Sequence, residues 1–218
     1  MLRSLNSLIG NRIIAKDGAA GTTLDLTVNC IQWHIGDLVT SVGSWWRSYE
    51  VRIPSVSLQR PVGATGMLPV SLTKKQMKES QSTDNNGSLQ RELKSDLLSA
   101  GVPIANFTAP RPIRWSSLVA YRVYALDGPA GVLRDMILND ENWHIRYLVV
   151  ELTAESVNHQ TLVSSDWISG VNENQSSVSL NLSIRELIGS PAYDPKVPVN
   201  RDIEGNLYDY YGQPFRHQ

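Results

Sequence analysis

Cysteine and long apolar runs are both scarce in this sequence. Cys30 is the single cysteine among 218 residues, so no intramolecular disulfide can form and a zinc site built from several cysteines is excluded. No stretch approaches the roughly 18 apolar residues that a bilayer-spanning helix needs, and the N-terminal segment lacks the continuous apolar core of a secretory signal. We therefore expect a cytoplasmic protein without a transmembrane segment.

An excess of charge of either sign is also missing. Twenty Lys and Arg against 21 Asp and Glu leave a formal net charge of −1 at pH 7. Surfaces that bind nucleic acid or anionic lipids are rich in positive charge, so this balance disfavours both kinds of partner. A basic patch on one face stays open, because the order of residues along a chain does not report where they cluster on the folded surface.

What the sequence does contain is an internal repeat at a shift of 110 residues. The segments from Asp17 to Ile35 and from Asp127 to Ile145 are identical at nine of 19 positions, where unrelated segments would share about one. The identical residues, numbered in the first copy, are Asp17, Gly18, Ala20, Gly21, Asp25, Asn29, Trp33, His34 and Ile35. We therefore expect a duplicated structural unit, with repeat 1 over residues 9–79 and repeat 2 over residues 119–189.

Alternating apolar and polar residues predict that both repeats are built from strands. Leu24, Leu26 and Val28 alternate with threonines and an aspartate, which is the period-two pattern of a strand with one buried face. Asp17-Gly18 indicates a hairpin turn, because glycine accepts positive φ without steric cost. We expect strands over residues 9–16, 22–29, 33–42, 51–53 and 67–72 of repeat 1, and over residues 119–125, 132–139, 143–152, 161–164 and 178–182 of repeat 2.

A short helix is predicted at the end of each repeat. Thr73 lies three residues before Gln76, and Ser183 three before Glu186, which is the capping-box pattern of a helix start. Between the repeats, the sequence is polar and then proline-rich, with one amphipathic helical pattern over residues 88–100. The predicted domains are residues 1–80, a linker over 81–112, residues 113–190, and a C-terminal docking tail over 191–218.

A set of short motifs in a fixed order carries a family resemblance. They are the Asp-Gly-x-x-Gly turns at Asp17 and Asp127, the aspartates Asp25 and Asp135, the strand over 143–150, the segment 51–54 and the junction 72–73. With these motifs, both repeats resemble the PRC-barrel domain, a small β-barrel shared by the photosynthetic reaction-centre H subunit and the ribosome-maturation factor family. The resemblance implies an all-β fold with minor helix: two tandem small barrels from an internal duplication, each followed by a short helix.

The resemblance implies a docking role and not a catalytic one. PRC barrels act as assembly modules without a defining catalytic residue set. We therefore expect a non-enzymatic binding module without a cofactor, peripheral to a membrane electron-transfer complex of the reaction-centre kind. Two alternatives stay open. One is an RNA- or ribosome-associated maturation factor, which an exposed stripe of Arg and Lys would favour. The other is a hydrolase, which would need a deep pocket that collects His144 with an acid and a nucleophile.

The residues that could carry chemistry are few, and we expect each to be structural. Cys30 and His34 would lie about 13 Å apart along one strand, too far for a thiol to be activated by the imidazole. His34 and His144 occupy equivalent positions but lack the three or four convergent ligands of a metal site. Asp25 and Asp135 belong to different repeats, so we expect them to bond a turn or a neighbouring strand. We predict no catalytic residue and no metal site.

Seven aromatic or basic residues are candidates for an interaction surface: Trp45, Trp46, Arg146, Tyr147, Tyr208, Tyr210 and Tyr211. Adjacent tryptophans in a strand point to opposite faces, so one of Trp45 and Trp46 either covers the barrel mouth or forms a binding patch. Arg146 and Tyr147, which Gly36 and Asp37 replace in repeat 1, either bind a partner or pair across strands.

The C-terminal tail is predicted to dock. Its aromatic cluster would expose several hundred square ångströms if the segment hung free, and soluble monomers rarely show so large an apolar patch. We expect it to lie on its own barrel, on the other barrel or on a second copy of the chain. A contact that joins units is preferred, because a polar linker replaces this stretch after repeat 1. We expect a homo-oligomer, with a dimer favoured, and an unidentified protein partner.

Overall fold

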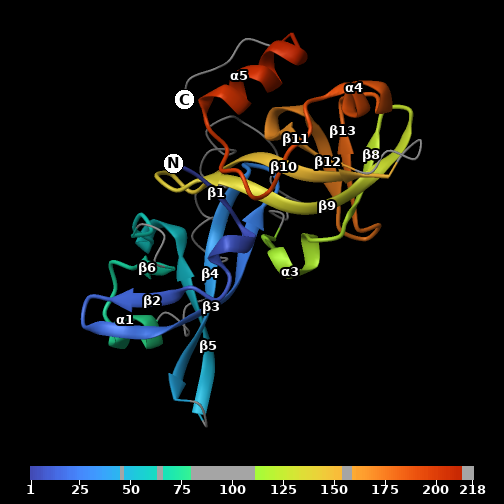
Figure 1. The fold of residues 1–218 in the computed structure, drawn as a ribbon. Helices are drawn as coiled ribbons and strands as arrows, with labels where there is room; N and C mark the ends of the chain where they lie inside the picture. Colours follow the sequence, from blue (N-terminus) through green and yellow to red (C-terminus); the bar gives the residue numbers. More distant parts are fainter. Residues whose placement is uncertain (45–46, 63–65, 80–110, 154–158, 213–218) are drawn as a thin grey trace, which may run out of the picture. The chain divides into compact units, whose positions relative to one another are not determined.

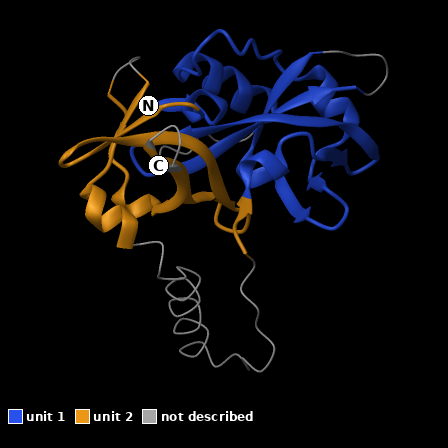
Figure 2. Ribbon diagram, turned by 90° about the horizontal axis from the view of Figure 1, so that it is seen from below, with its two compact units in different colours: residues 1–9, 114–218 blue, residues 10–113 orange. Residues whose placement is uncertain are grey.

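The computed structural model describes residues 1–44, 47–62, 66–79, 111–153 and 159–212. Strands dominate these residues, and the helices are short (Figure 1). The chain forms two compact units, one made of residues 1–9 and 114–218 (unit 1) and one made of residues 10–113 (unit 2) (Figure 2). None of the helices in the described residues is long and apolar enough to cross a membrane.

Unit 2 contains repeat 1. Its strands are β2 (Arg12–Ala15), β3 (Gly18–Asn29), β4 (His34–Ser44), β5 (Arg47–Pro54) and β6 (Met67–Pro69), followed by helix α1 (Lys74–Glu79). They pair in the order β6-β2-β3-β4-β5, and only the β2–β6 pair in this series is parallel. A 3₁₀ turn, η2 (Ser55–Ser57), follows β5.

Unit 1 contains repeat 2 together with both ends of the chain. After β7 (Ile113–Arg114) come α3 (Trp115–Leu118), β8 (Arg122–Ala125), β9 (Gly128–Asn139), β10 (His144–Leu152), β11 (Gln160–Ser164), η5 (Ser165–Trp167), β12 (Ile168–Asn172), β13 (Ser177–Leu180), α4 (Ile184–Gly189) and α5 (Arg201–Tyr210). Pairing runs β12-β13-β8-β9-β10-β11. Across the described strands, the hydrogen-bonded ladder does not close on itself in either unit. The β-rich fold is confirmed, and the two closed barrels stay a prediction.

The shift of 110 persists in the strand register. Arg12 pairs with Thr22 and Arg122 with Val132, and both hairpins carry a bulge one residue further on. The parallel pairs repeat too, with Arg12 opposite Met67 and Arg122 opposite Ser177. Even an unusual left-handed backbone recurs, with φ of 50° at Trp33 and 59° at Trp143. The two repeats therefore share one topology.

The Asp-Gly turn ties the first hairpin of each repeat to the helix at its end. Asp17 Oδ1 accepts the backbone N–H of Lys74 at 2.9 Å, and Asp127 Oδ1 accepts that of Ile184 at 2.8 Å. These are N–H groups of the first helical turn, which have no partner inside their own helix. The predicted capping boxes lie at the same two helix starts, at Thr73 and Ser183. The turn aspartate thus has a structural role beyond the hairpin itself.

One sequence-based assignment of a buried face is wrong. Leu24 was expected to share a buried face with Leu26 and Val28, but Leu24 is 49% exposed whereas the other two are fully buried. A bulge in the β3–β4 register between Thr23 and Asp25 shifts the alternation by one residue. As a result, Thr23 and Asp25 are buried and Leu24 faces outward.

The N-terminal segment does not lie with the first domain predicted over residues 1–80. Residues 1–9, which we call the arm, belong to unit 1, where β1 (Leu2–Ser4) pairs antiparallel with β9. The 3₁₀ turn η1 (Asn6–Leu8) follows, and Leu5, which precedes it, and Leu8, its last residue, are fully buried.

Strand β12 was not predicted from the sequence. The helix expected over residues 88–100 lies outside the described residues.

Candidate functional site

Five of the seven candidate interaction residues gather in unit 1. Arg146 and Tyr147 lie on β10, Tyr208 and Tyr210 lie on α5, and Tyr211 ends that helix. Trp45 and Trp46 lie outside the described residues, so their role stays a prediction. The site formed by β10 and α5 is called the tail-docking site below.

Helix α5, which was not predicted from the sequence, brings the tail residues to this site; the sequence predicted only that prolines keep the approach to these residues extended. Asn200 caps the helix, since its side chain accepts the N–H of Ile203 at 3.0 Å, and two acidic residues follow in the first turn. Ile203, Leu207 and Tyr211 recur at a spacing of four residues, so they lie along one face. The prolines that suggested an extended chain all precede this cap.

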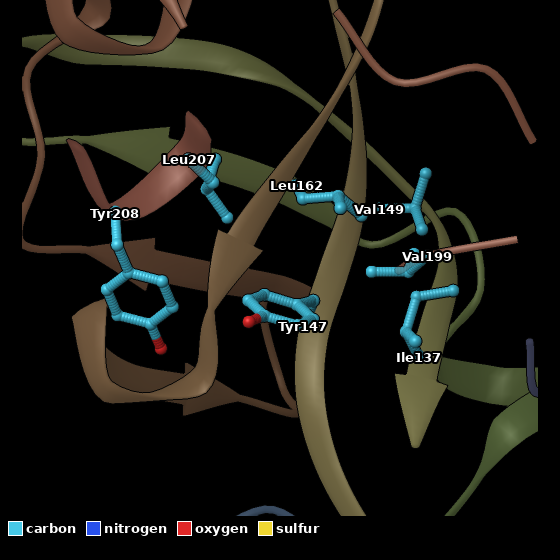
Figure 3. Close-up of a cluster of buried hydrophobic side chains, with 7 residues drawn as sticks. All are labelled: Ile137, Tyr147, Val149, Leu162, Val199, Leu207 and Tyr208. Atoms are coloured by element: carbon cyan, nitrogen blue, oxygen red, sulfur yellow. The ribbon is translucent and has the colours of Figure 1, made fainter. Parts of the chain in front are cut away.

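An apolar cluster forms the floor of the tail-docking site. Figure 3 shows its seven buried side chains, which come from β9, β10, β11 and the tail: Ile137, Tyr147, Val149, Leu162, Val199, Leu207 and Tyr208. Full burial of one such side chain contributes about 1.5–3 kcal/mol before ordering costs. The tail is therefore held mainly by burial against the strands of repeat 2.

A buried carboxylate adds a polar anchor to this cluster. The Tyr147 hydroxyl donates a hydrogen bond to Glu204 Oε1 at 2.7 Å, and Arg146 Nη2 lies 3.7 Å from the same oxygen. Glu204 is only 8% exposed, so these two partners replace part of the solvation that its carboxylate loses on burial. Burial and the hydrogen bond to Glu204 raise the pKa of Tyr147, so its hydroxyl remains a donor throughout the physiological range.

Aromatic contacts close the outer side of the site. The ring of Trp167 lies 5.8 Å from that of Tyr208 and 4.3 Å from that of Tyr211, between centroids, and Tyr210 lies 4.9 Å from Tyr211. The Tyr210 hydroxyl donates to the carbonyl of Glu186 at 3.0 Å. Burial raises the pKa of Tyr211 to about 12. These contacts fix the last turn of α5 against η5 and α4.

The tail begins to dock before the helix. Thr161 Oγ1 and Ser190 Oγ lie 2.6 Å apart, and the N–H of Tyr193 donates to the carbonyl of Gln160 at 2.7 Å. Ala192 forms a bridge with Thr161, so the start of the tail continues the pairing of β11. These contacts lie within unit 1. The preferred expectation of a tail that joins units is thus corrected: the tail docks in cis on the repeat that precedes it.

The tail docks on repeat 2 because repeat 1 does not offer the same apolar face. The positions equivalent to Ile137, Tyr147 and Leu162 are Thr27, Asp37 and Arg52, and the register confirms the match, since Val39 pairs with Arg52 as Val149 pairs with Leu162. Thr27 Oγ1 accepts the N–H of Asp37 at 2.8 Å, and burial raises the pKa of the Asp37 carboxyl. A tail with leucine and tyrosine anchors fits only the face of repeat 2.

The two aspartates that follow the Asp-Gly turns, Asp135 and Asp25, accept hydrogen bonds from nearby backbone groups. Asp135 accepts hydrogen bonds from the Ser4 hydroxyl, from the N–H of Asn6 at 3.1 Å and from that of Met136 at 2.8 Å, which is the strand-bonding role expected of it. Asp25, also buried, accepts the N–H of Leu26 at 2.9 Å.

The histidines stand at equivalent places in the two repeats. His34 and His144 pair in register with Asn29 and Asn139 at the starts of β4 and β10. Cys30 Sγ lies 3.9 Å from the carbonyl oxygen of Val28. In the parts of the chain that the structure describes, no three His, Cys, Asp or Glu side chains come together as a metal site would require.

Trp167 and Glu204 belong to the tail-docking site but were not singled out from the sequence. Trp167 could have been found by comparing the repeats, because a tryptophan there replaces Ser57 at the equivalent position of repeat 1.

No model of a known protein family matches this chain, and no curated protein matches its sequence. In the tail-docking site, a guanidinium, a phenol and a carboxylate engage one another where the apolar side of α5 packs on β10.

Proposed function

We propose that this protein is a non-enzymatic assembly module built from two tandem PRC-type barrels. Support comes from the features on which the resemblance is based. Both repeats keep the Asp-Gly turn, the glycine three residues later and the aspartate on the following strand, and both end in a capped helix. In this proposal the module works in the cytoplasm, peripheral to a membrane-bound electron-transfer complex of the photosynthetic reaction-centre kind.

One observation carries the assembly role. Unit 1 uses the strands of repeat 2 to bind two segments that lie outside that repeat: β1 of the arm on β9, and α5 of the tail over β9, β10 and β11. Both are bound by a combination of apolar burial and a carboxylate, the part-buried Asp135 for the arm and the buried Glu204 for the tail. A fold whose strand faces accommodate separate peptide segments is suited to hold the segments of a partner protein.

Co-sedimentation with photosynthetic membranes tests this proposal. The tagged full-length protein is mixed with membranes that contain reaction centres, and with the same membranes stripped of peripheral proteins. We expect saturable binding that an excess of untagged protein displaces, together with chemical cross-links to reaction-centre polypeptides. Ribosomes pelleted in parallel provide the competing result. Binding to ribosomes that falls steeply with salt, or binding to neither particle, would contradict the proposed location.

A further inference from the structure

The arm of this chain occupies a site with the features of specific strand recognition. Strand β1 extends the sheet of unit 1, with Leu2 opposite Asn139, Arg3 opposite Leu138 and Ser4 opposite Ile137. The N–H of Leu5 then donates to the carbonyl of Met136 at 2.8 Å. This is strand addition to β9, in which backbone hydrogen bonds hold the segment and side chains select it.

Two apolar anchors fix the arm. Leu5, just before η1, and Leu8, the last residue of η1, are fully buried in unit 1. Leu2 packs against the cluster that also holds the tail, so the arm and the tail share one apolar surface. The arm is therefore part of the core of unit 1 and not a loose end.

Polar side chains recognise other residues of the arm. Asp140, which is 1% exposed, accepts a hydrogen bond from Arg3 Nη2 at 3.2 Å. Asp135 accepts from the Ser4 hydroxyl and from the N–H of Asn6.

Asn6 is bound on both sides of its amide. Its Oδ1 accepts from Trp115 Nε1 at 2.9 Å, and its Nδ2 donates to the carbonyl of Arg134 at 3.0 Å. Arg3, Ser4 and Asn6 are thus each bound by a side chain of unit 1.

The connection between this bound arm and the rest of repeat 1 is very short. The chain leaves unit 1 at Ile9 and enters unit 2 at Gly10, with no residue between them. Gly10 adopts a φ of 81°, a left-handed conformation that glycine takes without strain. Exchange of an identical element between chains is a low-cost route to a dimer.

We propose that the arm exchanges between two copies of this chain, so that residues 1–9 of one copy add to β9 of the other. This inference rests on the proposed assembly function and names a second copy of the chain as one partner. The exchanged dimer keeps every contact of the bound arm, because the same residues fill the same site. Two things differ in the exchanged dimer. The backbone at Ile9–Gly10 takes another conformation, and the arm is no longer connected to the unit that it binds. That connection acts as an effective concentration of roughly millimolar. The dimer fraction therefore rises with protein concentration.

Disulfide trapping between separately mutated chains tests the exchange. In a Cys30→Ala background, one chain carries Leu2→Cys and the other Asn139→Cys, at positions paired across β1 and β9. After concentrated co-incubation and mild oxidation, we expect a disulfide-linked heterodimer. The matched control pairs Leu2→Cys with Ser179→Cys, an exposed position on β13 away from the arm register. We expect at least fivefold less dimer in this control.

Sedimentation velocity provides a second readout that does not depend on thiol geometry. The unmodified protein should show a dimer that grows between micromolar and millimolar concentration, and deletion of residues 1–9 should abolish it. A wild-type protein that stays monomeric over this range overturns the exchange, as does a dimer that persists after the deletion. Either result leaves binding to the membrane complex unaffected, so failure of the exchange and failure of the proposed function are distinguished.

Discussion

Gly131 lies directly against the backbone of Glu151, so that a Cβ at this glycine would stand 2.0 Å from the Glu151 carbonyl oxygen. Gly21 has the same relationship with the Ser41 carbonyl oxygen, also at 2.0 Å. In both repeats, this close approach lies between the longest strand and the strand that follows it: β3 and β4 in repeat 1, β9 and β10 in repeat 2. The second glycine of each Asp-Gly-x-x-Gly motif is therefore required by packing of backbone against backbone.

Replacement of this glycine should be severely destabilising. In Gly131→Ala the strands must separate, and we expect a loss of about 3 kcal/mol or more in the free energy of unfolding, measured by urea denaturation. The control is Gly205→Ala, because Gly205 lies within α5 with no atom near its missing Cβ. This control should stabilise the protein by about 0.5–1 kcal/mol. Equal effects of the two variants would refute the packing explanation.

The contribution of the tail can be measured at one buried side chain. Leu207 is 2% exposed in the apolar cluster, so Leu207→Ala should lower the free energy of unfolding by about 2–5 kcal/mol. Val197→Ala removes apolar atoms from a tail residue that is 44% exposed, and it should change stability by no more than about 0.5 kcal/mol. Truncation after Ser190 should lower the melting temperature further than Leu207→Ala. A truncated protein with an unchanged melting temperature would show that the tail is a passive end.

The capping box at α4 predicts a pH dependence. The side chain and the backbone N–H of Ser183 both bond Glu186, and these hydrogen bonds lower the pKa of its carboxyl in the folded state. A lowered folded pKa means that the stabilisation is present above the ordinary pKa, near 4.5, and is lost as pH falls through the folded value. Glu186→Gln should therefore be less stable than the wild type at pH 7 and should approach it in stability near pH 3. If Ser183→Ala leaves the pH-dependent difference intact, the hydrogen bonds are not its cause.

Much of the architecture could be predicted from local signals. The repeat, the turn aspartates and both capped helices follow from residue type at fixed spacing, and the turns and capping boxes form between residues a few positions apart. Leu24 shows where this reasoning fails, because a bulge reverses the face of a residue without changing the apolar pattern. The arm could not be assigned either. Its leucines mark it as buried but do not say in which unit.

The tail-docking site was only half predictable. The tyrosines of the tail and the Arg146–Tyr147 pair were recognised as candidates, but α5 itself was not predicted, since only the proline-containing approach to it was assigned a conformation. The more informative signal was the difference between the repeats. Four apolar or aromatic residues of the site replace polar ones of repeat 1: Ile137 for Thr27, Tyr147 for Asp37, Leu162 for Arg52 and Trp167 for Ser57. In a duplicated chain, the positions that diverge in polarity mark the face that has acquired a binding role.

The assembly function is inferred largely from the docking of α5 on β10 through Tyr147 and Glu204. A double-mutant cycle on these two residues measures that contact, using Tyr147→Phe, Glu204→Gln and the combined variant in urea denaturation. A buried hydrogen bond to a charged group predicts a coupling free energy of about 1.5–3 kcal/mol. The control cycle pairs Glu204→Gln with Tyr210→Phe, whose hydroxyl bonds the Glu186 carbonyl instead, and its coupling should be near zero. A Tyr147–Glu204 coupling as small as that of the control would contradict the docked tail.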